Sequence, residues 1–293
     1  MKKITCLLLC LYITVSFFGC GKQQEAAPEI ITPDVVGWTL TSEDGFDVTD
    51  GVTYLERRYV NDSQAPYQVY ILLLDPKKVT LHTGTSNNDF EIIPTVRQDV
   101  LEQMKASEED GLHVIAAVNG DFFAISSTYQ PSGLSVKSGV VISPNTKGRP
   151  YSAVTKEGEF FISHGFADGI DPFSLDMAVG GSHVIVSDGK AATFEEHDDL
   201  ANTSHPRTLA GVRADGTIIL AVIDGRQPLL SNGATLTQCA QLMIALGAVT
   251  AINHDGGGSS TMIIHKNDTY QVMNRPSDGG LRRVYCSIQV IEK

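Results

Sequence analysis

The sequence predicts an α+β domain in which a mixed, largely antiparallel sheet is flanked by a few amphipathic helices. Short apolar runs rich in β-branched residues recur along the chain, and only two segments have the apolar period of a helix. Hydrophobic residues make up 42% of the sequence and charged residues 19%, a balance typical of a globular domain. Two Asp-Gly pairs stand between apolar runs, which favours hairpins and therefore antiparallel pairing.

The expected strands are the apolar and β-branched runs themselves. They cover residues 69–74, 79–83, 114–118, 140–143, 160–163, 184–186, 218–223, 262–265 and 284–291. The hairpin turns are expected at Asp188-Gly189 and at Asp215-Gly216, because Asp-Gly favours the positive backbone angles of a two-residue turn.

Two segments are predicted to be helices that lie on the sheet. The first has Pro94 in its first turn, apolar residues at fourfold spacing and a stop at Gly111. The second begins with the capping-box pair Thr235 and Gln238, continues as an apolar stripe and ends at Gly247.

The start of the chain is typical of an export signal, with two early lysines and then an apolar run too short to span a bilayer comfortably. Gly19 precedes Cys20 as in a lipobox, where the cysteine receives the lipid. We expect residues 1–19 to be a lipoprotein signal peptide, 20–33 a polar tether and 34–293 the folded domain. The protein would then be exported to the cell envelope and attached to the membrane by lipid. An ordinary signal peptide and a signal anchor are the alternatives.

Charge and cysteine content exclude some classes of partner and site. The formal net charge of −12 argues against nonspecific binding of nucleic acid. After Cys20 only Cys239 and Cys286 remain, so a single disulfide is the most that can form, and we expect two separate buried thiols instead. No histidine stands at ligand spacing from either cysteine, which argues against a zinc site.

Polar side chains gather where four apolar runs begin or end. Asn119 and Asp121 follow the first run through a glycine turn. Arg207 and Thr208 stand at the start of the second run, where a planar and permanently charged guanidinium suits a phosphate or a carboxylate.

The other two segments place an acid before glycine. In the third, Asp224 is followed by Gly225 and Arg226. In the fourth, Asp255 leads into three glycines whose amides can face an anion at close range, and two serines follow. A simple turn explains an isolated Asp-Gly pair, and a tight structural crossover is the alternative for the glycine run. The P-loop, the dinucleotide-binding fingerprint and the nucleophile elbow are all absent from the sequence.

In this order the four segments resemble the phosphodiester glycosidase family, which includes the animal enzyme that removes N-acetylglucosamine from phosphodiester-capped mannose. The resemblance covers a motif core over residues 110–290 and ends with residues 274–279 and Arg282. The chain departs from the family at His254, where leucine is common, and at Leu209, where alanine is common. Both are packing positions, so we expect activity to persist, although His254 can reshape the pocket.

The resemblance implies hydrolysis of the sugar C1–O bond in a sugar-1-phosphodiester. Asp255 is expected to be the central carboxylate, with Asp121 as its partner and Asp224 as a third candidate, because an oxocarbenium-like centre favours anionic neighbours. Cations and amides would stabilise the departing phosphate. The residues expected to bind the substrate and its phosphate are Asn119, Arg207, Thr208, Arg226, Gly256, Gly257, Gly258, Ser259, Ser260 and Asp278.

Two other functions remain open on the sequence. The three aspartates Asp121, Asp224 and Asp255 are a candidate site for a divalent cation, Mg²⁺ or Ca²⁺, in a phosphodiesterase that cleaves the P–O bond. The chain is also consistent with a noncatalytic carbohydrate-binding lipoprotein. In each case the expected partners are a glycan or sugar phosphate and, through the lipid, the membrane.

Overall fold

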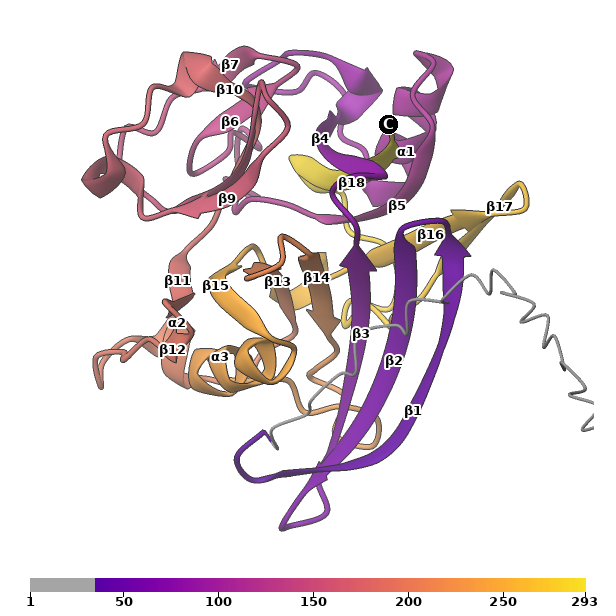
Figure 1. Ribbon diagram of the computed structural model, residues 1–293, viewed down its shortest axis with the longest axis vertical. Helices are drawn as coiled ribbons and strands as arrows, with labels where there is room; N and C mark the ends of the chain where they lie inside the picture. Colours follow the sequence, from indigo (N-terminus) through magenta and orange to yellow (C-terminus); the bar gives the residue numbers. More distant parts are fainter. Residues whose placement is uncertain (1–34) are drawn as a thin grey trace, which may run out of the picture. The chain divides into compact units, whose positions relative to one another are not determined.

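The computed structural model describes residues 35–293, whose strands form three sheets of eight, five and five strands (Figure 1). All strand pairs within these sheets are antiparallel. The predicted signal peptide, the lipidation site Cys20 and the tether lie outside the described residues. No helix of residues 35–293 is long and apolar enough to cross a membrane.

The eight-stranded sheet has the order β1-β2-β3-β14-β13-β15-β11-β12. Its strands are β1 (Trp38–Thr49), β2 (Val52–Asn61), β3 (Pro66–Leu74), β11 (His183–Ser187), β12 (Lys190–Ala191), β13 (Arg207–Arg213), β14 (Ile218–Ile223) and β15 (Ala248–Asn253). The expected Asp-Gly hairpins are confirmed, since one joins β11 to β12 and the other joins β13 to β14.

The two smaller sheets complete the β structure. One has the order β7-β6-β10-β8-β9 and the other β17-β16-β5-β18-β4. The first is built from β6 (Ser135–Lys137), β7 (Val140–Ser143), β8 (Tyr151–Thr155), β9 (Phe160–Ser163) and β10 (Leu175–Gly180). The second is built from β4 (Val79–Thr85), β5 (Val114–Asn119), β16 (Met262–Lys266), β17 (Thr269–Val272) and β18 (Cys286–Glu292).

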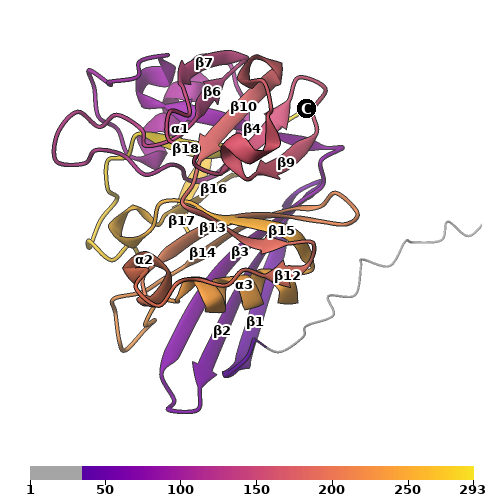
Figure 2. The same cartoon turned by 90° about the vertical axis from the view of Figure 1, so that its left-hand side faces the viewer.

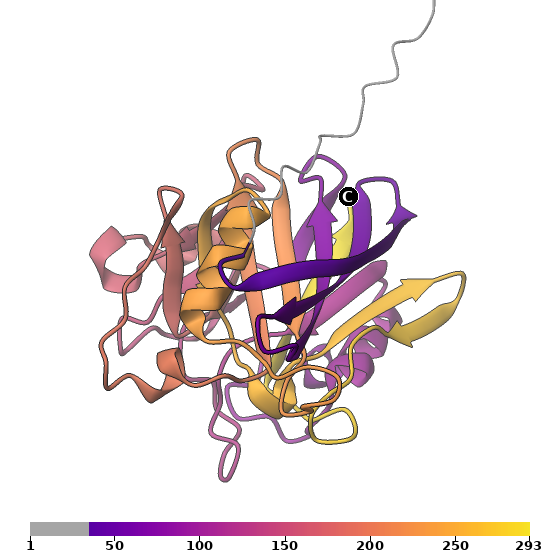
Figure 3. The ribbon, with the colours of Figure 1, turned by 90° about the horizontal axis from the view of Figure 1, so that it is seen from below.

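Strand β14, a central strand of the large sheet, is apolar at every position. Ile218, Leu220 and Val222 pack into the core that the three sheets share, whereas Ile219 and Ile223 pack toward α3 (Leu236–Ala245). Successive side chains of a strand point to opposite faces, so a strand with two buried faces is apolar throughout. Figure 2 shows α3 on one side of the central strands and the smaller sheets on the other, and Figure 3 shows α3 lying across these strands.

The two predicted helices are present, one of them with a different start. Helix α3 begins after the capping box of Thr235 and Gln238, as expected. Helix α1 (Val100–Glu109) begins four residues after Val96, the first apolar residue of the predicted helix, because Asp99 and Glu102 form a capping box that starts it there. A short helix, α2 (Asp199–Asn202), and four 3-10 turns add to these.

The predicted fold class is confirmed as α+β, with strands dominating over helices. The expected strands are all present, and β18 starts two residues later than predicted. The long hairpin of β1 and β2 was not expected, because its exposed face interrupts the apolar pattern. Strands β6, β8, β10 and β17 were not predicted either. Cys239 and Cys286 are two separate buried thiols, as expected.

Candidate functional site

Asn119, at the end of β5, joins three segments around the glycine run. Its side-chain oxygen accepts hydrogen bonds from the Thr208 hydroxyl at 2.6 Å and the Thr261 amide at 3.1 Å. Its side-chain nitrogen donates to the backbone carbonyl of Asp255 at 2.7 Å. Asn119 and Thr208 are both fully buried. This corrects the expectation that they bind substrate, because their polar atoms instead hold the Asp255 backbone in place.

Asp121 is a buried carboxyl group at the centre of the site. One carboxyl oxygen, Oδ2, accepts the amide of Gly133 at 2.7 Å, and the other, Oδ1, has no hydrogen-bond partner. Gly180 lies so close that a Cβ there would be 2.7 Å from Oδ2. Burial raises the pKa of Asp121 to about 7, and the negative charge of Asp255 adds to the rise.

Asp255 begins the glycine run and is partly exposed. Its backbone amide donates to the carbonyl of Gly120, next to Asp121, and its Oδ1 accepts the amide of Gly256. Burial raises its pKa to about 6, while the Ser259 hydroxyl and nearby guanidinium groups partly offset that rise. The structure thus brings the two expected catalytic carboxyl groups together, with different exposure.

His254 packs behind this pair. Its Nδ1 lies 2.8 Å from the carbonyl oxygen of Gly180, and its Nε2 lies 3.1 Å from the Ser152 hydroxyl. Burial lowers the His254 pKa to about 4, so the ring is neutral and donates from Nδ1 to the carbonyl. Gly180 lies in close contact with the Asp121 carboxyl group, so the hydrogen bond from His254 holds the backbone that encloses Asp121.

Arg149 lies beside both carboxyl groups and was not anticipated from the sequence. Its Nη2 is 3.9 Å from Asp121 Oδ1, and both atoms are buried without a hydrogen-bond partner. Its Nε donates to the carbonyl of Gly181 at 3.0 Å, which fixes the guanidinium. Its positive charge lowers the pKa of Asp121 and of Asp255. No motif surrounds Arg149, so only the fold reveals its place.

Arg282 covers the other side of the glycine run. Its guanidinium binds Asp278 through Nε at 2.8 Å and through Nη2 at 2.6 Å, and its Nη1 donates to the Ser259 hydroxyl at 3.3 Å. A Cβ on Gly258 would be 2.2 Å from the Arg282 and Asp278 side chains, so a larger residue there would displace this ion pair. Asp278, expected to bind substrate, therefore orients Arg282.

Arg226 is exposed and reaches over Gly257. Its two terminal guanidinium nitrogens would lie 3.2 Å from a Cβ on that glycine. The imidazole of His205 lies 3.4 Å from Arg226 Nη2, and burial together with two arginine charges lowers the His205 pKa. Arg226 keeps its expected place beside the glycine run, and His205 is an additional neighbour.

Arg207 does not reach the site, which corrects the expectation that it binds phosphate. Its side chain is 1% exposed and donates to the carbonyl oxygens of Ala234, Leu200 and Thr203 at 2.7–2.8 Å. Thr208 faces Asn119, so its neighbour along β13 points to the opposite face, toward α3. Arg207 holds a loop together behind the sheet.

Asp224 is also a structural residue. Its oxygens accept the Tyr70 hydroxyl at 3.0 Å, the Asn274 side-chain amide at 3.0 Å and the Arg275 backbone amide at 2.9 Å. These contacts hold the segment that follows β17. Among the described residues no three histidine, cysteine, aspartate or glutamate side chains gather as a metal site, so Asp224 does not join the other two aspartates in the expected cation site.

The glycine run is more fully hydrogen-bonded than expected. The amide of Gly256 donates to Asp255, and the amide of Gly257 donates to the carbonyl of Pro206 at 2.9 Å. These two amides therefore fix the loop instead of facing an anion. The Ser260 hydroxyl is buried and has no partner among the described residues, so it keeps its hydrogen-bonding capacity.

This arrangement of aspartates, arginines and glycines agrees with the sequence comparison. A sequence model of the phosphodiester glycosidase family matches residues 113–291, which include every polar group of the site. The chain belongs to the phosphodiester glycosidase family. The family is of hydrolase type, so the protein is assigned to the hydrolases at that level.

Individual proteins resemble this member of the phosphodiester glycosidase family along most of its length. The SPbeta prophage-derived protein YomE of Bacillus subtilis is 26% identical over 291 residues, which cover 89% of this chain and 41% of YomE. The chain thus spans about two fifths of this curated relative.

Two solved structures share the fold. The catalytic domain of zebrafish N-acetylglucosamine-1-phosphodiester alpha-N-acetylglucosaminidase, auto-inhibited by its pro-peptide, has a TM-score of 0.64 and 17% identity, covering 87% of this chain and 89% of that one. A Synechocystis protein has a TM-score of 0.65 and 14% identity, covering 88% of this chain and 68% of that one.

Proposed function

We propose that the protein hydrolyses the bond between the anomeric carbon and the bridging oxygen of a sugar-1-phosphodiester. One observation carries this proposal: two carboxyl groups with raised pKa values, Asp121 and Asp255, lie together between two guanidinium groups, Arg149 and Arg282. A protein that only bound carbohydrate would have little use for two buried acids beside arginines, because burying a carboxyl group costs stability.

The arginines suit the leaving group. Cleavage at C1 releases a phosphate monoester, whose developing charge needs cations more than it needs an acid. Arg226 and Arg282 flank the glycine run and are only partly covered, so we assign them to the phosphate. They replace Arg207 in this role.

The two carboxyl groups divide the remaining work. With pKa values of about 6 and 7, the pair holds one proton between these pH values, on Asp121. Asp255, the more exposed of the two, then carries the negative charge that faces the anomeric carbon or activates water. A protonated Asp121 keeps a second negative charge away from Asp255 and from the phosphate.

The bond that breaks can be identified with oxygen-18 water. The purified full-length chain is incubated with an N-acetylglucosamine-1-phosphodiester in labelled water, and both products are analysed by mass spectrometry. Label in the released sugar is the expected result. Asp255→Asn, an isosteric change, should slow turnover about a thousandfold or more while leaving the thermal unfolding temperature near that of the wild type.

The two other functions give different results in the same experiment. Label in the phosphate product means cleavage of the P–O bond, and loss of turnover in a chelator would assign that reaction to a divalent cation. Binding of the substrate without any product would identify a carbohydrate-binding protein. Either result would overturn the proposed hydrolysis at C1.

A further inference from the structure

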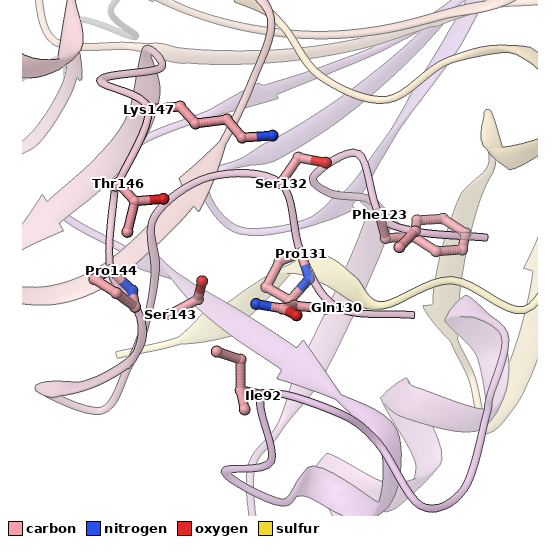
Figure 4. A pocket seen from close by; sticks show the side chains of 10 residues that line it. Ile92, Phe123, Gln130, Pro131, Ser132, Ser143, Pro144, Thr146 and Lys147 are labelled. Atoms are coloured by element: carbon pink, nitrogen blue, oxygen red, sulfur yellow. The ribbon is translucent and has the colours of Figure 1, made fainter. Parts of the chain in front are cut away.

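A cavity of about 360 Å³ is lined by segments next in sequence to Gly133 and Arg149 and is not part of the site described above (Figure 4). Its walls come from residues 123–132, which follow β5, and from residues 143–147, which follow β7. Ile92 contributes from a third segment.

Both main walls of the cavity lead along the chain to residues that approach Asp121. Gly133 comes directly after the first wall and donates its amide to Asp121, and the Ser132 amide donates to the carbonyl of Phe122. The second wall leads within two residues to Arg149, whose guanidinium carbon lies 5.2 Å from the centre of the Phe122 ring. The two segments that line the cavity thus also carry Gly133 and Arg149, the two residues that approach the Asp121 carboxyl group.

The lining suits a polyhydroxylated anion. Hydroxyl groups of Ser132, Ser143 and Thr146 and the side-chain amide of Gln130 offer hydrogen bonds, and Lys147 adds a positive charge. In Figure 4 the Lys147 amine and the Ser132 hydroxyl lie on the same side of the cavity.

Charge is the distinctive property of this cavity. None of the described residues that line it is acidic, although the chain as a whole has a formal net charge of −12. Within residues 35–293 Lys147 takes part in no ion pair, so its charge is not neutralised by the protein. An exposed cation above hydroxyl groups favours an anionic ligand.

We propose that this cavity binds the alcohol half of the phosphodiester and selects a sugar or polyol that carries a second negative charge, as a phosphate or a carboxylate. The assignment of the cavity to the alcohol half of the substrate rests on the proposed function. The preference for an anionic polyol rests on the cavity alone.

Equilibrium binding tests that preference without turnover. Glucose 6-phosphate, glucuronate and glucose are titrated into the full-length chain by calorimetry. We expect both anions to bind at least about tenfold more tightly than glucose, and the stronger of the two identifies phosphate or carboxylate as the preferred group. Lys147→Met should weaken anion binding about tenfold. Lys156 is an exposed lysine in the turn after β8, so Lys156→Met is the matched control and should leave anion binding unchanged.

Two results would overturn the inference. One is equal affinity of wild type and Lys147→Met for both anions. The other is loss of anion binding in Arg226→Met with no loss in Lys147→Met, since the anion would then occupy the arginines over the glycine run. Failure of the oxygen-18 experiment alongside Lys147-dependent binding would remove the proposed reaction but leave the anion site in place.

Discussion

Asp121 and Asp255 are chemically identical side chains that the fold makes different. Asp121 is enclosed by glycine backbone and has one carboxyl oxygen without a partner, whereas Asp255 is partly exposed and receives an amide and a hydroxyl. Burial disfavours the charged form, and each donor favours it, so the proton resides on the more enclosed residue. The separation of roles between two acids follows from these local contacts.

The pH dependence of hydrolysis should reflect the titration of Asp121 and Asp255. We expect kcat/KM to be bell-shaped, with limbs near the pKa values of about 6 and 7. Activity falls below the lower value because Asp255 gains a proton, and above the upper value because Asp121 loses one. Asp121→Asn cannot lose a proton there, so it should remove the alkaline limb. An unchanged alkaline limb in this variant would assign that limb to another group.

Arg207 and Arg226 should respond in opposite ways to the same substitution. Arg207→Lys removes donors from three buried carbonyl oxygens, so we expect the free energy of unfolding to fall by about 1–3 kcal/mol with little change in KM. Arg226→Lys should raise KM severalfold and leave stability nearly unchanged, because the side chain is exposed. Urea denaturation and steady-state kinetics measure the two effects. A larger KM change for Arg207→Lys would contradict the placement of its guanidinium.

At the scale of elements, the start of a helix was predicted correctly where the capping box was recognised in the sequence. It was misplaced where the prediction used the apolar period alone. The Thr235 and Gln238 pair marks the start of α3 in both sequence and structure. The start of α1 was placed too early, because Pro94 suits a first turn and Val96 extends the apolar spacing of Val100, although Asp99 and Glu102 form the actual cap. Local side-chain hydrogen bonds decided the boundary.

The cap of α3 can be tested directly. Thr235→Ala removes the hydroxyl that accepts the Gln238 amide, so we expect a loss of about 1 kcal/mol in the free energy of unfolding. Thr237→Ala, an exposed position within the same helix, is the matched control and should be neutral or slightly stabilising. Equal destabilisation by the two variants would argue against a role for the cap.

At the scale of the whole molecule, the site depends on the meeting of three sheets. Asp121 follows a strand of one small sheet, Arg149 precedes a strand of the other, and Asp255 follows a strand of the large sheet. Their side chains meet because all three sheets pack around one apolar core. A change that separates the sheets would therefore abolish the site before it unfolds any single strand.

We also propose that the whole protein is exported and attached to a membrane through a lipid on Cys20. Cys20→Ser cannot form the thioether to lipid, so we expect this variant to lose incorporation of labelled palmitate and to leave the membrane fraction. Cys239→Ser changes a buried thiol instead and is the control. Palmitate labelling that persists in Cys20→Ser would place the lipid elsewhere or reject the lipoprotein assignment.

Sequence by itself determined many of the strands, the hairpin turns, the α3 cap and the family, because these depend on local periodicity, backbone preferences and an ordered set of motifs. It also predicted that Asp121, Asp255 and Arg226 lie near one another, and the structure places Asp121 and Asp255 side by side and Arg226 over the glycine run. Tertiary structure decided which polar residues face that site. Arg207 and Thr208 are neighbours in sequence but point to opposite faces of β13, and Arg149 enters from a loop without a motif. Direction and long-range contact arise only when the sheets pack together, so adjacency along the chain could not reveal them.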